Sequence, residues 1–503
     1  MSQAIVSVNA GILLPVLAPA VGAAVVLVAD VAVQQLRRAH YVIALASLVV
    51  GALATIAGLS MVAGGARRTL CLPGSGQCMY VADSVASTLQ LAALLAAALT
   101  LLLTWPDDKK QSTGGTAVIV SLVLAATAGA TAVAGARDLG SWLVALELAT
   151  LPTVALVALR GARSAISGAI ALLTTALVSF GLLALSAALW FTATGSGFFT
   201  PAAAITAIND PARRPILVLA VVVVIAGIGF KLSLVPFHAW TPEAYDGAPL
   251  PIAAFLAGVS KIAALAALLV VIRAIPPGEP SLAAIAIVSA VSMTLGNIMA
   301  LRQDGVVRLL AWSTVAQAGW VVLPLAAVST GAVHASGAYL LAYVLATLLV
   351  FAVVAALVQI RGAARARDLQ EYRGLLADHP VLASALGLGL LSLAGLPPGF
   401  LGLVAKVAAL GPVVNSQLWL LAVIAAVNAV LGVAVYLRWL LMVVSTPDTS
   451  VQGSPDGVPE PVVHGAALVV RAHPATLAAV GFTGVALVLT SLSPQLLLGL
   501  LGG

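Results

Sequence analysis

Residues 215–240 read PILVLAVVVVIAGIGFKLSLVPFHAW, an apolar run that carries a lysine and a proline. A helix needs about 20 apolar residues to cross the hydrocarbon core of a bilayer, so this run is long enough to span it. Proline inside a span frees backbone carbonyl groups, and such broken helices are tolerated where they line a polar cavity. The run therefore predicts a transmembrane helix that is broken near Lys231 and Pro236.

Similar apolar runs recur along the whole chain. Hydrophobic residues make up 62% of the 503 residues and charged residues 8%, and the mean hydropathy is +1.14. Soluble proteins carry about 25% charged residues. The runs lack the period-2 alternation of a barrel, which predicts an all-α polytopic membrane protein. About fourteen spans are expected, near 10–33, 41–63, 84–105, 114–135, 139–160, 163–194, 215–240, 248–273, 281–303, 306–330, 333–359, 380–411, 416–444 and 473–500.

Arginine and lysine residues in the loops predict the orientation of the chain. One set of alternate loops, which includes Arg37, Arg160 and Arg361, holds about twice as many basic residues as the other set, and the richer set faces the cytoplasm by the positive-inside rule. Both termini are then expected outside. The net charge of +6 falls in short loops, so no nucleic-acid partner is expected. Residues 1–10 lack a basic region, so no removable signal peptide is predicted.

Two cysteines, Cys71 and Cys78, bracket the sequence LPGSGQ in a loop that this orientation places outside. A short Pro/Gly-rich loop can bring two thiols within bridging distance, and the outside is oxidising, so a disulfide is predicted. Two free cysteines are the alternative, and no metal site is expected from two cysteines alone. Residues 445–473 are polar and indicate a cytoplasmic linker. No nucleotide or redox motif is present, so no cofactor is expected in this chain.

Four ionisable residues lie well within predicted spans, away from their ends: Glu147, Lys231, Lys261 and Lys406. An isolated charge at mid-bilayer is costly, so such residues face the bundle interior or water. Burial favours the neutral amine of a lysine, whereas a nearby carboxylate favours the ammonium. Lysines that share one movable carboxylate partner can therefore each gain or lose a proton as the carboxylate moves. Such a chain of lysines is a proton relay. A static ion pair or a lysine that reaches toward the membrane surface is the alternative.

Two of these lysines lie beside helix breaks. Lys231 precedes Pro236, and Lys406 follows Pro397 and Pro398. Breaks at corresponding places in two halves of a chain indicate inverted repeats. The spans divide into two inverted five-helix repeats, helices 4–8 and 9–13, with helices 7 and 12 broken. The expected division of the chain is 1–113 for helices 1–3, 114–273 and 274–444 for the two repeats, and 445–503 for the linker and helix 14.

Uncharged polar side chains are expected in the same interior. Gln317 lies in helix 10, and Tyr339 and Tyr343 lie four residues apart on one face of helix 11. His238 follows the helix 7 break. These residues would support a proton path, but ordinary hydrogen bonds between helices explain the tyrosine spacing equally well.

Residues 229–249, GFKLSLVPFHAWTPEAYDGAP, resemble the helix 7–8 signature of the antiporter-like subunits of respiratory complex I. The form WTPEAYDGAP is most similar to subunit N of NADH-quinone oxidoreductase. The resemblance covers about 140–440. Supporting matches are LELATLP at 146–152, GNIMALRQ at 296–303, RLLAWST at 308–314 and LSLAGLPP at 391–398.

The resemblance implies a role for each buried charge. Glu147 matches the helix 5 carboxylate that modulates the helix 7 lysine, Lys231. Lys261 matches the connecting lysine of helix 8, and Lys406 the terminal lysine of helix 12. Gln317 stands where many relatives carry a histidine. In this chain the helix 12 lysine lies about one residue later than in relatives, which turns it about 100° around the helix.

The function implied by the resemblance is proton translocation in the membrane arm of a proton-pumping NADH:quinone oxidoreductase. The chain would be a non-redox translocase subunit of a bacterial cell membrane, in contact with lipid and other membrane-arm subunits and only indirectly with the peripheral redox arm. A subunit of an Mrp-type cation/proton antiporter or of a membrane-bound hydrogenase is the first alternative. A purely structural membrane subunit is the second, and the buried lysines argue against it.

Overall fold

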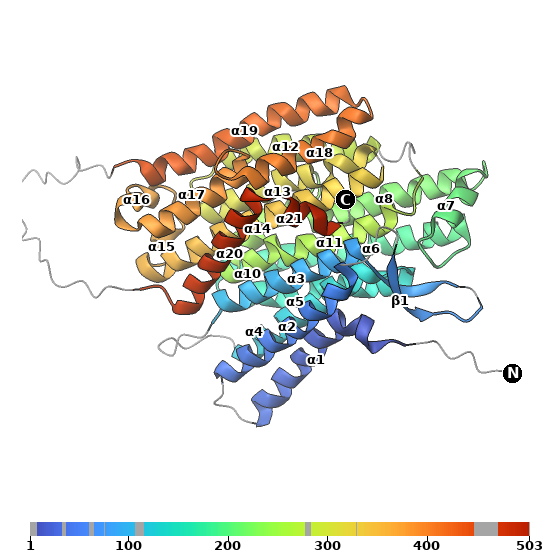
Figure 1. The fold of residues 1–503 in the computed structure, drawn as a ribbon, viewed down its shortest axis with the longest axis horizontal. Coiled ribbons are helices and arrows are strands. Elements are labelled where there is room, and N and C mark those ends of the chain that lie inside the picture. Colours follow the sequence, from blue (N-terminus) through green and yellow to red (C-terminus); the bar gives the residue numbers. More distant parts are fainter. Residues whose placement is uncertain are drawn as a thin grey trace, which may run out of the picture.

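Long helices, roughly parallel to one another, build the molecule (Figure 1). The computed structural model describes residues 8–32, 37–59, 65–74, 76–105, 115–276, 283–327, 329–446 and 471–501. Within this part of the chain, thirteen helical segments are long and apolar enough to cross a membrane. They are α1 Ala10–Ala32, α2 Arg37–Leu59, α3 Ser84–Leu103, α4 Thr116–Gly135, α5 Leu139–Ala158, α6 Arg163–Thr194, α8 Arg214–Leu232, the pair α10 Leu250–Ala257 and α11 Val259–Ile272, α12 Ala283–Leu301, α13 Val306–Val322 with the 3-10 turn η2 Leu323–Ala327, α14 Thr330–Arg361, α19 Trp419–Val444 and α20 Pro474–Leu492.

A fourteenth span consists of two shorter helices, α17 Pro380–Ala394 and α18 Phe400–Asn415. They occupy the run predicted as helix 12. Gly395, with φ +79°, ends α17, and Pro397 and Pro398 follow in the connection. The prediction of a polytopic helical protein with about fourteen spans is confirmed.

The predicted break in helix 7 follows α8. Ser233 adopts a left-handed conformation with φ +68° and ends the helix, and the chain resumes helical structure in α9 (Trp240–Gly247). Helix 8 differs from the single span expected at 248–273, because Gly258 (φ −103°, ψ −85°) separates α10 from α11. Glycine lacks a Cβ and adopts irregular backbone conformations at low cost. The break in helix 8 places Lys261 in the first turn of α11.

A two-stranded hairpin, which the sequence did not predict, adds a small β element to the helical bundle. Strand β1 (Ala66–Cys71) pairs antiparallel with β2 (Cys78–Asp83), and Cys71 and Cys78 are joined by a disulfide at the turn end. Gly74 and Gly76 have positive φ, which the reversal of the chain requires. The remaining short elements are α7 Pro201–Ile208, α15 Ala363–Ala366, η3 Gln370–Tyr372, α16 Leu375–Asp378, α21 Gln495–Leu498 and η4 Gly499–Leu501.

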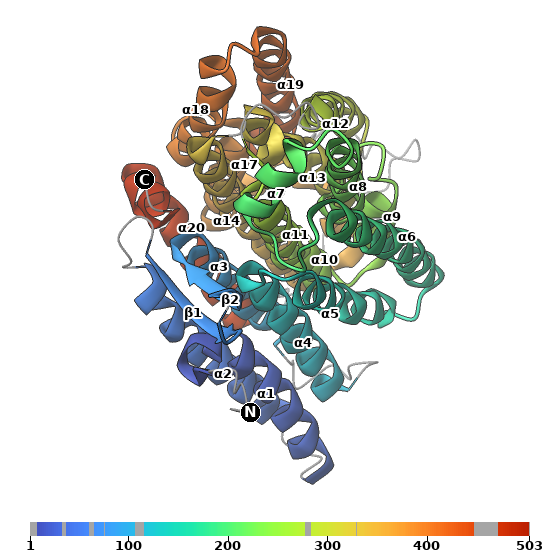
Figure 2. The same ribbon diagram turned by 90° about the vertical axis from the view of Figure 1, so that its right-hand side faces the viewer.

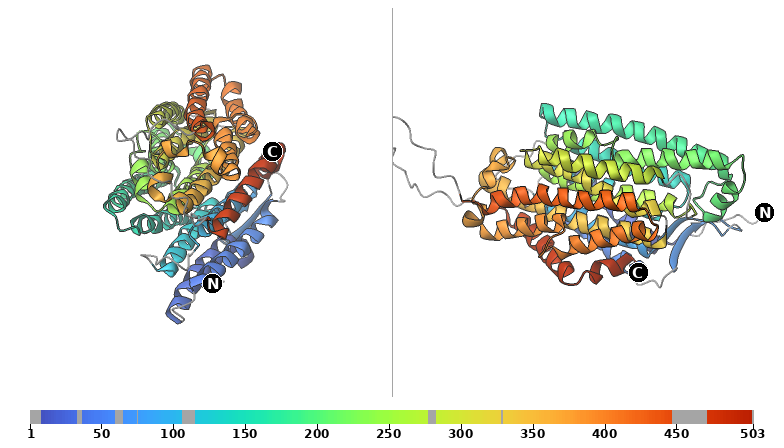
Figure 3. Two further views of the ribbon diagram at one scale, coloured as in Figure 1. Left: turned by 90° about the vertical axis from the view of Figure 1, so that its left-hand side faces the viewer. Right: turned by 90° about the horizontal axis from the view of Figure 1, so that it is seen from above.

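The connections lie at two opposite ends of the bundle. The hairpin and α7 lie at one end, and α15 and α16 lie at the other (Figures 1 and 3). Seen end-on in Figure 2, α10, α11, α13 and α14 lie inside a ring of other helices, with α1 and α2 at one edge and α19 at the opposite edge. The side chains of α11 are almost all buried. The interior helices therefore position groups away from lipid.

Candidate functional site

Glu147 and Lys231 form an ion pair inside the bundle. The Lys231 Nζ lies 3.0 Å from the Glu147 Oε1 and 2.7 Å from the Thr150 Oγ1. Glu147 and Thr150 are three residues apart in α5, so they share one helix face. Lys231, in the last turn of α8, therefore has a charged and an uncharged partner side by side. Sequence reasoning did not identify Thr150, although its spacing from Glu147 was a usable signal.

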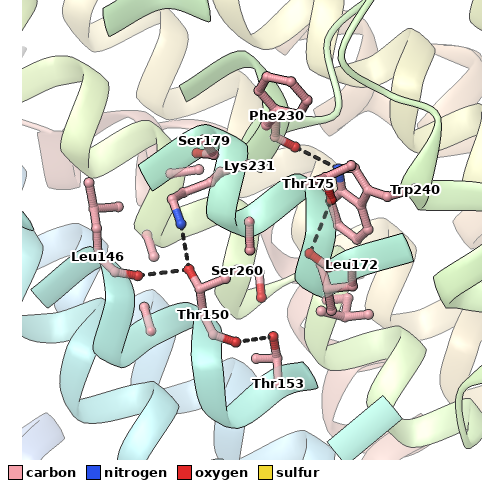
Figure 4. A pocket seen from close by; sticks show the side chains of 15 residues that line it. Leu146, Thr150, Thr153, Leu172, Thr175, Ser179, Phe230, Lys231, Trp240 and Ser260 are labelled. Carbon is pink, nitrogen blue, oxygen red and sulfur yellow. Dashed lines mark hydrogen bonds between the residues drawn. The ribbon is translucent and has the colours of Figure 1, made fainter. Parts of the chain in front are cut away.

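A small cavity of about 30 Å³ lies beside Lys231 (Figure 4). Its walls carry several hydroxyl groups among apolar side chains. A cavity needs roughly 10–15 Å³ to hold a water molecule, which requires polar partners. This space therefore fits about two waters in contact with the Lys231 ammonium. The hydroxyl groups belong to Thr150, Thr153 and Thr175, with Ser179 and Ser260.

Lys261 is fully buried in the first turn of α11. Its Nζ lies 3.0 Å from the Lys231 carbonyl oxygen and 2.5 Å from the Ser233 Oγ, and 4.9 Å from the centroid of the Trp240 ring. The break after α8 leaves this carbonyl without a helical donor. Among the described residues, no carboxylate lies within 4 Å of the Lys261 ammonium. The broken helix itself therefore supplies the polar partners of Lys261.

Lys406 in α18 occupies the corresponding place at the second break. Its Nζ donates to the Ala394 carbonyl at 2.6 Å and lies 5.7 Å from the centroid of the Trp320 ring. Gly395 makes room for it, since a Cβ at that position would come within 3.2 Å of the Lys406 Nζ. The helix 12 lysine thus contacts a helix-end carbonyl, as Lys261 does at the helix 7 break.

Polar side chains from three helices meet beside Lys406. The Gln317 side chain accepts from the Tyr339 hydroxyl at 2.5 Å and donates to the Tyr436 hydroxyl at 2.8 Å. Tyr343 donates to Thr314 at 3.0 Å. A cavity of about 10 Å³ adjoins this cluster, which is close to the room that one water needs. Sequence reasoning missed Tyr436, which lies in the mainly apolar helix α19.

The structure brings some predicted residues together and keeps others apart. Glu147, Lys231 and Lys261 are linked through direct contacts. Tyr339 stacks on Trp320, the ring that Lys406 faces, with centroids 5.7 Å apart. His238 packs against Trp312 and has no direct contact with a lysine in the described part of the chain.

A polytopic bundle with charged side chains buried in its interior defines a class of membrane protein that carries ions or protons. The family described as NADH:quinone oxidoreductase/Mrp antiporter, TM, matches residues 136–432. A curated relative, NADH-quinone oxidoreductase subunit N of Salinispora tropica, is 38% identical over 447 residues, which is 86% of this chain and 85% of the relative. This chain therefore belongs to the NADH-quinone oxidoreductase subunit N family.

Two solved structures share the fold of this chain. A chain of respiratory complex I from Thermus thermophilus with bound aureothin is 31% identical, with a TM-score of 0.75, and the alignment covers 97% of this chain and all of that chain. A chain of the Mrp complex from Dietzia sp. DQ12-45-1b has a TM-score of 0.81 at 21% identity, with 98% and 96% coverage. The second likeness concerns the fold alone.

Proposed function

We propose that this chain is a proton-translocating subunit in the membrane arm of an NADH:quinone oxidoreductase. One contact carries the proposal: Lys261, without a carboxylate partner within 4 Å among described residues, hydrogen-bonds the backbone of Lys231, which is itself paired with Glu147. A lysine without a fixed counter-ion can exchange its proton more readily than a paired one. Protons would pass from Lys231 to Lys261 and on toward Lys406 through waters and hydroxyl groups.

The energy for this movement would come from redox chemistry in other subunits. In the proposal, NADH, flavin and iron–sulfur clusters belong to those subunits, and this chain acts as a translocase without a cofactor of its own. Its partners are other membrane-arm subunits and the lipid of a bacterial cell membrane. The loops at the α15 and α16 end face the cytoplasm, and both termini lie outside.

An antiporter subunit of the Mrp type is less well supported. The Mrp chain shares the fold at 21% identity, whereas the subunit N relative is 38% identical over most of both chains. A function is carried by the site and not by the fold. The higher identity therefore favours the oxidoreductase assignment.

Replacing Lys261 tests the proposal. In purified, assembled complex, Lys261→Ala should lower the number of protons pumped per electron while electron transfer to quinone continues. Lys261→Arg should also fail, because arginine keeps the charge but does not release its proton. Wild-type pumping in either assembled variant would exclude Lys261 from the proton path.

A further inference from the structure

Two buried hydroxyl groups face each other across the break in helix 7. Ser233 is the first residue after α8, and Thr241 is the second residue of α9. Their oxygen atoms lie 2.5 Å apart, and the Ser233 Oγ also lies 2.5 Å from the Lys261 Nζ. Both side chains are fully buried. The three groups therefore form a short hydrogen-bonded row from α9 to α11.

The number of protons in this row depends on the charge of Lys261. An ammonium has three donors and no acceptor, whereas a neutral amine has two donors and one lone pair. When Lys261 is charged, it donates to Ser233, whose oxygen also accepts from Thr241 through its second lone pair. When Lys261 is neutral, its lone pair accepts from Ser233, and Ser233 accepts from Thr241. Each charge state thus favours one orientation of the Ser233 hydroxyl, while Thr241 donates to Ser233 in both.

We propose that the Ser233 hydroxyl, held in place by Thr241, is a switch that reorients with each change of charge on Lys261 and positions this lysine for proton exchange. The inference deepens the proposed function and rests on it. Because the pair offers an acceptor to the ammonium and a donor to the amine, it stabilises both states. A fixed carboxylate would stabilise only the ammonium.

Few other titratable groups face Lys261. Of the described helices packed against α11, α5 contributes Glu147, α8 contributes Lys231, and α14 contributes Tyr339 and Tyr343 within the membrane interior. The described residues of α3, α4 and α10 contain no titratable side chain. Lys231 donates to Glu147 and Thr150, and Tyr343 donates to Thr314. The hydroxyl pair is therefore the nearest partner of Lys261 whose hydrogen bonds can change with the charge of the lysine.

The backbone at Ser233 separates two explanations for the residue. A left-handed conformation is costly for residues with a Cβ and easy for glycine. If Ser233 served only to turn the chain, glycine would serve as well or better. If the hydroxyl is needed, Ser233→Gly keeps the turn and removes the function. Ser233→Ala removes the same hydroxyl but keeps a Cβ in the left-handed conformation, whereas Ser233→Gly also relieves that strain.

The test compares hydroxyl variants in purified complex by measuring protons pumped per electron across a range of pH. Ser233→Gly removes the oxygen that accepts from the Lys261 ammonium, and Thr241→Val removes the hydroxyl that holds this oxygen in place. The alkaline limb of the pH profile is the range in which pumping falls as the pH rises. In both variants this limb should lie about one pH unit lower than in the wild type. Thr241→Ser restores the hydroxyl and should restore the wild-type limb.

Thr127→Val is the matched control. Thr127 is equally buried, but its hydroxyl donates to Val123 within α4, so its loss should leave the pH profile unchanged. A wild-type profile in both Ser233→Gly and Thr241→Val would overturn the switch. If Lys261→Ala abolishes pumping while these variants behave as wild type, only the switch is wrong. If Lys261→Ala pumps normally, the proposed function is wrong and the switch falls with it. Ser233→Gly alone decides the question if Thr241→Val does not assemble.

Discussion

Glu147 and Lys231 are both largely buried, with side-chain exposures of 15% and 8%. At an effective dielectric near 20, opposite charges about 4 Å apart attract by about 4 kcal/mol. One pH unit of proton affinity corresponds to about 1.4 kcal/mol. Complete separation of Glu147 from Lys231 would therefore lower the proton affinity of the lysine by up to about a thousand-fold, and a partial movement by correspondingly less. Thr150 can hold the neutral amine while the carboxylate is away.

Glu147→Gln should impair pumping, because an amide cannot supply the charge that holds a proton on Lys231. Glu147→Asp should keep part of the activity if the shorter side chain still reaches. Protons pumped per electron in purified complex decide between a switch and a static bridge. A static bridge between α5 and α8 predicts poor assembly but full coupling in whatever complex survives.

Gly395→Ala should disturb Lys406 directly. The left-handed backbone at Gly395 makes alanine unfavourable by about 1 kcal/mol or more, and the new Cβ would push the ammonium from the Ala394 carbonyl. We expect lower thermal stability together with reduced pumping.

Gly195→Ala provides a matched control for that prediction. Gly195 also ends a helix, α6, with φ +67°, and a Cβ there meets nothing within 4 Å. Thermal unfolding should show a comparable loss for both variants, while only Gly395→Ala should pump poorly. Equal pumping in the two variants would mean that Lys406 does not depend on the space that Gly395 leaves for its side chain.

The charged site residues could be predicted because charges are rare and costly inside a span. Ser233 and Thr241 could not be singled out in the same way, and Thr150 only through its spacing from Glu147. Hydroxyl residues are frequent throughout this chain, and most bond a carbonyl of their own helix, as Thr127 does. Only the fold shows which of them face a lysine.

At the scale of elements, proline made the breaks in helices 7 and 12 predictable. Gly258 gave no comparable signal, because glycine is common inside transmembrane helices. The hairpin was also missed, since each strand is only six residues long and such short strands are weakly specified by sequence alone. The role of the hairpin follows from the contacts of one of its residues, Asp83.

Asp83 joins the hairpin to two helices of the interior. Its carboxylate lies 2.7 Å from Arg273, directly after α11, and 3.3 Å from Arg137, before α5, and it caps α3 through the Ala86 N–H. Burial opposes the charge of Asp83, but the Arg273 and Arg137 guanidinium groups and the hydrogen bonds outweigh it and hold the pKa of the carboxyl below its ordinary value. One carboxylate thus fixes the ends of the helices that carry Glu147 and Lys261.

Asp83→Asn should destabilise the protein by about 1–2 kcal/mol near neutral pH. Because folding lowers the pKa of Asp83, its contribution is complete above the unfolded value of about 4 and is lost as the pH falls through the folded value. The difference in melting temperature between wild type and variant should therefore vanish in acid. Asp378→Asn, which removes an exposed partner of Arg361, should have little effect at any pH. If the difference in melting temperature between wild type and Asp83→Asn does not change with pH, the charge of Asp83 is not the cause of that difference.

For the whole molecule, connections predicted on one side of the membrane do lie together. Asp83, Arg137 and Arg273 meet at the hairpin end, whereas Asp246 and Arg367 pair at the other end. Alternation of loops could be predicted because every span must return the chain to the opposite side. The direction of the molecule in the membrane rests on the balance of arginine and lysine alone.

Introduced cysteines would determine this direction in intact cells. Ala202, in α7, and Ala364, in α15, are both exposed and lie at opposite ends of the bundle. A membrane-impermeant maleimide should label Ala202→Cys in intact cells and Ala364→Cys only after the cells are opened. The reverse pattern would invert the proposed orientation while leaving the fold unchanged.

The two broken helices also set an electric field inside the protein. Helix α8 enters from the hairpin end and α17 from the opposite end, and the last carbonyls of each bind a lysine. The carboxyl end of a helix carries the equivalent of about half a negative charge, so two negative dipole ends point into the middle of the bundle. Peptide dipoles cannot be titrated, so this field is the same at every pH and in every redox state of the complex. Lys261 and Lys406 therefore each lie at the negative end of a helix, which stabilises a positive charge at both positions.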